Sequence, residues 1–338
     1  MMSIAIVSTG LVTSVGLSAP AACAAIRSKL TNPSETRFLD SNGAWIMAHQ
    51  VALERPWRGI ARLSKMAGKA ISECLAEVPL QQWSDIPLLL CVAERERPGR
   101  TQGLEDELLT EIQNELGVEF GSESLVIPQG RVGVAVALKH ARALIREQDV
   151  PLVIIAATDS LVTGPTLSAY ERELRLLTAN NSNGFMPGEG ASALLIATPE
   201  RGAELLCVGL GFGVEPAHID SGDPLRADGL VTAHRAALEN AKCDLGELVF
   251  RITDLSGEQY YFKEADLALS RLLRVRQEDP ELWHPAESTG ACGAALGGIC
   301  LAVAHAAFTK QYAPGPKVLC HFSDDQGRRA SVIATRGT

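Results

Sequence analysis

The sequence has no apolar run that approaches the roughly 20 residues needed to cross a lipid bilayer, and no basic stretch precedes the apolar residues 4–7. We therefore expect a cytoplasmic protein without a membrane-spanning segment. Positive charge is also scarce, because 31 Lys and Arg face 40 Asp and Glu, which gives a formal net charge of −9. Since phosphate groups are bound by clustered Lys and Arg, nucleic acid is not an expected partner.

Paired cysteines are absent too, because the eight cysteines are scattered and none belongs to a CxxC pair. Most of them fall inside apolar helix or strand patterns, which favours buried thiols that act as small hydrophobic side chains in a reducing compartment. We expect neither a metal site nor a cofactor. The cysteines are Cys23, Cys74, Cys91, Cys207, Cys243, Cys292, Cys300 and Cys320.

The sequence does contain a repeated alternation of apolar strands and helices. The continuous apolar run 152–157 follows a helical segment at 133–146. Strands without polar alternation indicate a parallel or mixed sheet that helices cover on both faces. A length of 338 residues suggests two structural units, and we place them at 1–200 and 204–338.

Two segments carry more specific expectations. The segment 94–102 holds three Arg and two Glu, so we predict a solvated loop. The segment 290–308 is rich in Gly and Ala and is predicted to form one helix. Because Gly costs a helix about 1 kcal/mol relative to Ala, Gly293, Gly297 and Gly298 indicate that another backbone packs closely there.

Three segments in sequence order resemble motifs of the β-ketoacyl-acyl-carrier-protein synthases, which belong to the thiolase superfamily. Residues 10–16, before a helix at 19–27, are similar to that family's first loop and helix. Residues 185–191 (FMPGEGA) are similar to GFVMGEGA, and residues 288–298 (STGACGAALGG) to MTGHTLGAAGA. The resemblance covers nearly the whole chain, which is shorter than usual for the family. It implies an α/β protein with the duplicated, layered α/β/α/β/α thiolase-like fold, mixed five-stranded sheets and a homodimer.

The resemblance also implies a chemistry, a Claisen condensation in which a Cys thiolate accepts the acyl group and two His stabilise the oxyanion. Aligning the motifs places Arg131 where the family has the Cys, Asp254 in place of the first His and Ala291 in place of the second. The family's Lys falls on Ala286, and its gating loop becomes residues 323–327. Because loss of the nucleophile abolishes covalent catalysis, we expect these positions to be vestigial and the condensation to be absent.

Two relocated chemistries stay open. Cys292 follows the lost second His at the expected start of a helix, whose dipole would lower the pKa of a thiol, and His284 lies upstream. The alternative is a small residue packed in a Gly/Ala helix. A cluster of Asp254, Glu258 and Glu287 around the old pocket would suit general acid–base catalysis if burial raised the pKa of one carboxyl group. The alternative is solvent-facing or salt-bridged carboxylates, with Arg131 as a partner.

Gln129 resembles the Gln that replaces the Cys in chain length factors, which are ketosynthase-like subunits of polyketide synthases, although its register differs by two residues. The residues expected to line the old pocket are Gln129, Gly257, Glu258, Glu287, Thr289, Gly290 and Asp325.

The function that we expect is that of a non-catalytic thiolase-fold scaffold. Degenerate thiolase-like proteins of this kind resemble accessory proteins of type VI secretion, so the expected protein partner is an effector or an adaptor. The alternative is an atypical 3-oxoacyl-acyl-carrier-protein synthase, or an inactive, chain-length-factor-like partner of an active ketosynthase in fatty acid or polyketide synthesis. A ligand in the vestigial acyl tunnel is compatible with both functions.

Overall fold

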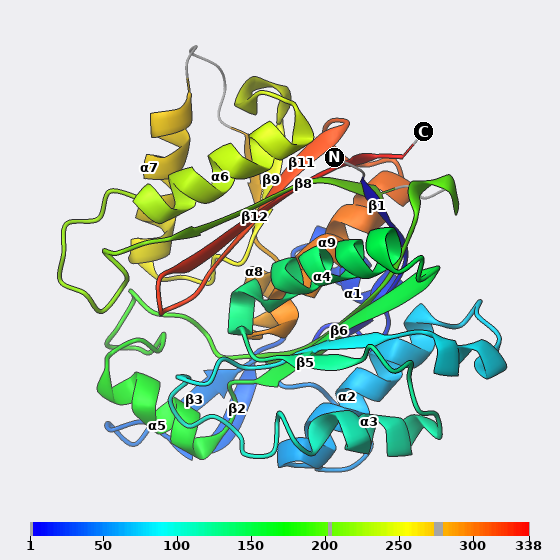
Figure 1. Ribbon diagram of the computed structural model, residues 1–338. Helices are drawn as coiled ribbons and strands as arrows, with labels where there is room; N and C mark the ends of the chain where they lie inside the picture. The colour runs from blue at the N-terminus through cyan, green and yellow to red at the C-terminus, as the bar shows by residue number, and fades with distance from the viewer. Residues whose placement is uncertain (1–2, 202–204, 274–279, 338) are drawn as a thin grey trace.

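Ten strands form one mixed sheet in the computed structural model, which describes residues 3–201, 205–273 and 280–337 (Figure 1). A separate pair of strands forms a small hairpin. The strand bounds are β1 Ile4–Val12, β2 Ser34–Leu39, β3 Trp45–Ala48, β4 Leu88–Cys91, β5 Leu125–Ile127, β6 Leu152–Ser160, β7 Glu189–Ala197, β8 Leu205–Val214, β9 Phe250–Thr253, β10 Glu281–Trp283, β11 Lys317–Ser323 and β12 Arg328–Arg336.

The large sheet consists of two five-stranded halves that repeat one topology. Their spatial order is β10-β9-β11-β12-β8 followed by β1-β7-β6-β4-β5. In each half the third strand along the chain lies at the outer edge and the first lies at the junction. The three strands nearest the outer edge pair in parallel, whereas the others pair antiparallel. Strands β1 and β8 join the halves, with Ile4 opposite Cys207. This repetition confirms the expected duplicated fold with mixed sheets.

The helices form an inner layer and two outer layers. Helices α4 and α9 contact each other and strands of both halves, while α2 and α6 cover the outer faces (Figure 1). Within the described residues, no helix combines the length and the apolar composition needed to cross a lipid bilayer. The bounds are α1 Ala19–Arg27, α2 Gly59–Cys74, α3 Leu108–Leu116, α4 Gly133–Glu147, α5 Gly164–Arg172, α6 Asp228–Ala241, α7 Gln259–Leu272, α8 Ala286–Thr289 and α9 Ala295–Thr309, with short 3-10 turns at Leu80–Asp85, Gly130–Val132, Pro199–Arg201 and Leu245–Glu247.

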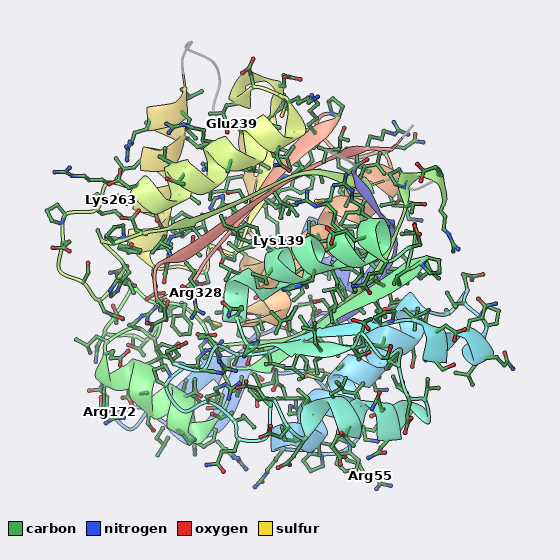
Figure 2. The ribbon with its side chains drawn as sticks, in the orientation of Figure 1. Arg55, Lys139, Arg172, Glu239, Lys263 and Arg328 are labelled. Atoms are coloured by element: carbon green, nitrogen blue, oxygen red, sulfur yellow. The ribbon has the colours of Figure 1, made fainter. Side chains whose placement is uncertain are left out.

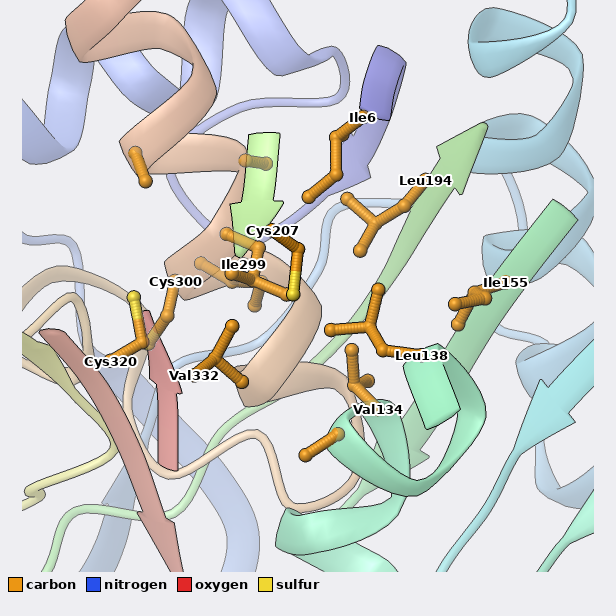
Figure 3. Close-up of a cluster of buried hydrophobic side chains, with 14 of the residues drawn as sticks. Ile6, Val134, Leu138, Ile155, Leu194, Cys207, Ile299, Cys300, Cys320 and Val332 are labelled. Atoms are coloured by element: carbon orange, nitrogen blue, oxygen red, sulfur yellow. The ribbon is translucent and has the colours of Figure 1, made fainter. Parts of the chain in front are cut away.

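The main hydrophobic core lies between the two halves of the sheet, around α4 and α9. Figure 3 shows Val134 and Leu138 of α4 beside Ile299 of α9. Full burial of such an aliphatic side chain stabilises a fold by about 1.5–3 kcal/mol. The thiols Cys207 and Cys320 belong to this core as well. All eight cysteines are free and seven are buried, as expected for small hydrophobic residues.

Local sequence signals account for the start of the first helix. The Ser18 side chain accepts a hydrogen bond from the N–H of Ala21 at 3.4 Å, and Pro20 stands in the first turn, where it removes an N–H that has no partner within a helix. Glu73 of α2 accepts from the N–H of Ala19 at 2.8 Å. The structure therefore begins α1 at Ala19, as the sequence predicts, and ties it to the outer layer.

Two expected boundaries were wrong. Strand β1 continues through Gly10, where a loop was expected, because Gly10 packs directly on α2; a Cβ there would lie 2.0 Å from the carbonyl oxygen of Ala70. The expected single helix 290–308 is also broken. Ala291 exchanges backbone hydrogen bonds with Met186 and Gly188, at 2.8 and 3.1 Å, so this stretch is extended and α9 starts only at Ala295.

The proposed boundary between the two units, at 200–204, remains a prediction. Residues 202–204 lie outside the described residues.

Candidate functional site

The position expected to hold the nucleophile is occupied by a paired arginine. Arg131 lies in the 3-10 turn Gly130–Val132, directly before α4. Its Nη2 donates to Asp325 at 2.7 Å and to the hydroxyl of Tyr261 at 2.8 Å. Its Nε lies 3.9 Å from Oδ2 of Asp254. The structure thus brings Arg131, Asp254 and Asp325 together, three residues that the motif alignment singles out.

A second arginine, Arg175, completes this ion-pair network. Its guanidinium binds Glu258 at 2.8 and 3.0 Å and Asp325 at 2.8 and 3.1 Å, so both contacts are bidentate. Arg175 follows α5 and was missed by the sequence analysis. No local signal marks it, because charged residues already dominate 171–175.

Asp325 is the common partner of both arginines. Burial alone would raise the pKa of its carboxyl group, but the guanidiniums of Arg131 and Arg175 hold that pKa well below its ordinary value. The hydroxyl of Tyr261 also donates to Asp325. Burial raises the pKa of Tyr261, so the phenol stays protonated as a donor. The result is a buried, charged and hydrogen-bonded cluster.

Asp254, which the motif alignment sets against the family's first His, differs from Asp325 in its electrostatics. Burial raises the pKa of its carboxyl group from 3.8 to about 6, although Arg131 and the N–H of Ser323, which donates at 2.9 Å, both oppose that rise. Asp254 therefore changes its charge in a mildly acidic pH range, which is the chemistry of a weak general base.

The segment 94–102 was expected to be solvated, and half of that expectation was wrong. Arg97 donates to Glu94 at 2.8 Å and to Asp159 at 2.9 Å, and all three side chains are buried. Asp159 also accepts from the N–H of Ala294 at 2.8 Å. The charge of this segment predicted exposure. The ion pairs of Arg97 with Glu94 and Asp159 offset the free energy that is lost when these charges leave water. Arg95, by contrast, is exposed as expected.

These charged side chains leave only a small cavity between them. The remaining cavity has a volume of about 20 Å³, enough for about one water molecule. Arginines and carboxylates dominate its wall, and Ala291 contributes at the position of the second His. The charged residues that line the cavity are Glu94, Arg97, Arg131, Arg175, Glu258 and Asp325.

Cys292 is not placed as a nucleophile. It precedes α9 by three residues and is fully buried, with its Sγ 3.2 Å from the carbonyl oxygen of Thr289 and 3.4 Å from that of Glu189. Burial raises the pKa of its thiol to about 12. The thiol therefore lies in the core and not at an open helix start, which agrees with the alternative of a small packed residue.

Of the three carboxylates considered as an acid–base cluster, Glu287 does not join the other two. Glu287 points away from the network: its side chain is half exposed, and its Oε1 lies 3.5 Å from His284. Gln129 also lies to the side, where its Oε1 accepts from Nη1 of Arg328 at 2.8 Å; Figure 2 labels Arg328. Neither Glu287 nor Gln129 lines the cavity.

Three further residues shape the backbone around the site. Gly257 has a φ of +128°, and a Cβ there would lie 2.5 Å from the carbonyl oxygen of Gly184. Gly290 has a φ of +70° between α8 and the extended stretch. The Thr289 hydroxyl donates to the carbonyl of Pro285 at 3.2 Å. None of these three residues lines the cavity. The charged groups of the site are those of the ion-pair network.

Comparisons with known proteins agree on the fold. No protein-family model matches the sequence, and no curated protein matches it. Among solved structures, the ishigamide ketosynthase/chain length factor is 16% identical, with 99% of each chain covered and a TM-score of 0.82. The complex of the ketosynthase ApeO with its chain length factor ApeC from Xenorhabdus doucetiae is 13% identical. It covers 99% of this chain and 98% of that chain, with a TM-score of 0.79.

A β-ketoacyl synthase from Burkholderia phymatum is 16% identical, with 99% of this chain and 100% of that chain covered and a TM-score of 0.76. At identities this low the likeness concerns the fold alone. The chain has the thiolase-like fold of the β-ketoacyl synthases and chain length factors.

Proposed function

We propose that this protein is a non-catalytic thiolase-fold scaffold that acts by binding another protein. The observation that carries the proposal is the Arg131–Asp325 ion pair, beside a cavity of about 20 Å³. The motif alignment sets Arg131 against the family's nucleophile. A guanidinium stays protonated and donates hydrogen bonds, so it cannot accept an acyl group as a thiolate does. No acyl chain fits beside it without breaking the network.

The oxyanion-stabilising positions support the same proposal. Catalysis of the condensation requires hydrogen-bond donors aimed at the developing negative charge. Asp254 at the first position offers a carboxylate, and Ala291 at the second offers a side chain without a polar atom. A carboxylate repels an oxyanion unless it is protonated, and removal of a single donor already lowers a rate by about 10²–10³.

Intact-mass spectrometry tests the absence of covalent catalysis. The protein is incubated with acyl-carrier-protein thioesters and, separately, with the ketosynthase inhibitor cerulenin, beside an intact ketosynthase as positive control. We expect no mass shift under conditions that label the control. An adduct that disappears in the Cys292→Ala variant would overturn the proposal and establish a relocated nucleophile.

Two classes of protein partner remain for the scaffold. The resemblance to type VI secretion accessory proteins points to an effector or an adaptor. Genes for a spike protein, an effector and a small adaptor are then expected next to the gene for this protein. We propose this class first, together with a cytoplasmic location and a homodimer formed through the sheet, in which β5 and β10 are the terminal strands.

The second candidate is an inactive subunit of a ketosynthase. The solved structures with this fold include ketosynthases in complex with a chain length factor, and one of them covers 99% of both chains. An adjacent gene for an intact Cys-His-His synthase and one for an acyl-carrier protein are then expected. Co-expression with that synthase, followed by size-exclusion chromatography with light scattering, distinguishes a 1:1 heterodimer from the homodimer.

A further inference from the structure

A second cavity, of about 330 Å³, lies apart from the ion-pair network and shares no lining residue with it. It is formed where the ends of α1 and α9 meet β10 and α8. Its apolar wall includes Trp283 of β10, Val303 of α9 and Tyr312. A cavity of this volume, with aromatic and aliphatic walls, is within the range of sites for small ligands.

The aromatic wall holds an arginine in place. The rings of Trp283 and Tyr312 are stacked, with centroids 6.1 Å apart and planes 27° apart, and Trp283 packs on Phe250 at 5.1 Å. The guanidinium carbon of Arg27 lies 4.0 Å from the centroid of the Tyr312 ring. Stacking on an aromatic face orients a guanidinium while its N–H groups, which lie in the guanidinium plane, remain able to donate.

The two cations that line the cavity have no carboxylate partner among the described residues. These cations are Arg27 and Lys29. The two carboxylates of the wall are already engaged. Glu281 accepts from Nε1 of Trp283 at 2.9 Å, and Glu287 lies 3.5 Å from His284. A ligand that enters therefore meets free donors mainly at the end of α1.

We infer that this cavity binds a small acid, a carboxylate attached to a flat apolar group. The carboxylate would accept two parallel hydrogen bonds from the guanidinium of Arg27, with Lys29 as a second cation. The flat group would lie against Trp283 and Tyr312. The hydroxyl of Tyr312, which is protonated at neutral pH, adds a further donor. This site is independent of the proposed scaffold function.

Fluorine NMR on the full chain labelled with 5-fluorotryptophan tests the inference. The resonance of Trp283 is assigned from the spectrum of the Trp283→Phe variant, and the probe is indole-3-acetate. We expect a saturable shift of this resonance with a Kd below about 1 mM. Indole-3-acetamide, which has the same ring but no charge, is expected to bind at least about tenfold more weakly, because it loses the charge-assisted hydrogen bonds.

Variants separate the role of Arg27 from a general effect of charge. Arg27→Gln is expected to weaken indole-3-acetate about tenfold and to leave indole-3-acetamide unchanged. Arg55→Gln is the matched control, because Arg55 lies over Trp57, 5.9 Å from the ring centroid, away from this cavity. The inference is wrong if the Trp283 resonance does not move at 10 mM probe, a concentration about tenfold above the expected Kd. It is equally wrong if the acid and the amide bind alike.

Discussion

Asp325 accepts a hydrogen bond from Arg131 at 2.7 Å and thereby joins the turn between β11 and β12 to the start of α4. Arg175 binds the same carboxylate from a third segment of the chain. A closed network of charges therefore lies at the residues that the motif alignment sets against a synthase nucleophile and its gating loop.

Asp325→Asn is expected to destabilise the protein by about 3–5 kcal/mol, because Arg131 and Arg175 then lose the carboxylate that they share. Urea unfolding measures the change in free energy. Glu247→Gln is the matched control, since Glu247 forms an exposed pair with Lys317 and its loss is expected to change stability by less than about 1 kcal/mol. Equal losses in the two variants would show that the network at Asp325 is not a strong structural element.

Asp254→Asn is expected to change how stability depends on pH. The pKa of Asp254 rises from 3.8 to about 6 on folding, so the folded state keeps a proton that the unfolded state releases. Stability from this group is therefore greatest below pH 4 and is lost as pH rises to about 6, by roughly 3 kcal/mol in total. The difference in unfolding free energy between wild type and variant, measured from pH 4 to 7, isolates this effect. A difference that is flat across this range would contradict the assignment.

A buried histidine produces the opposite trend. His234 is fully buried against Ser331, with its Nδ1 2.7 Å from Oγ, and burial lowers its pKa from 6.5 to about 3, with a further contribution from Arg251. Below pH 6.5 the histidine is protonated in the unfolded state but stays neutral in the folded state. The free energy of unfolding therefore falls on acidification, by up to about 1.4 kcal/mol per pH unit.

His234→Gln removes this titration, so we expect its stability to decline less than that of wild type between pH 6.5 and 4.5. Urea unfolding at each pH provides the comparison. An identical decline in both proteins would rule out His234 as a source of acid sensitivity.

Gly298→Ala tests the packing of α9. A Cβ at Gly298 would lie 2.1 Å from Oγ and 2.7 Å from Cβ of Ser192, whereas one at Gly297 would lie 3.3 Å from Val134. Overpacking is expected to destabilise Gly298→Ala by about 1–3 kcal/mol. In Gly297→Ala the helix propensity of Ala, worth about 1 kcal/mol, offsets a milder contact. We therefore expect Gly298→Ala to unfold at a lower temperature than Gly297→Ala. The reverse order would contradict the close contact between Gly298 and Ser192.

The sequence predicts elements well where the signal is local and poorly where it depends on distant partners. Helix α1 begins at its capping residue, Ser18, and β5 coincides with its apolar run, so both could be predicted. The buried state of Arg97 could not, because it depends on Asp159, which is 62 residues away, as well as on the nearby Glu94. Arg175 was missed for the same reason, since Glu258 and Asp325 follow it by 83 and 150 residues.

The motif alignment was more informative about the site than any local pattern. It set Arg131 against the family's Cys and Asp254 against its first His. In the structure the Nε of Arg131 lies 3.9 Å from Oδ2 of Asp254. It could not predict the pKa of Cys292, because the extended stretch that buries this residue forms by pairing with residues 186–188. Helical composition alone suggested an open helix start there.

The release of labelled carbon dioxide from malonyl-acyl-carrier protein tests the central claim most directly. Decarboxylation requires oxyanion donors, and the proposed scaffold function holds that Asp254 and Ala291 stand in their place. We expect the rate with this protein to equal the rate in buffer, while an intact ketosynthase in the same assay turns over. Release above the buffer rate that is lost in Asp254→Asn would contradict the claim and show that the charged network is a working active site.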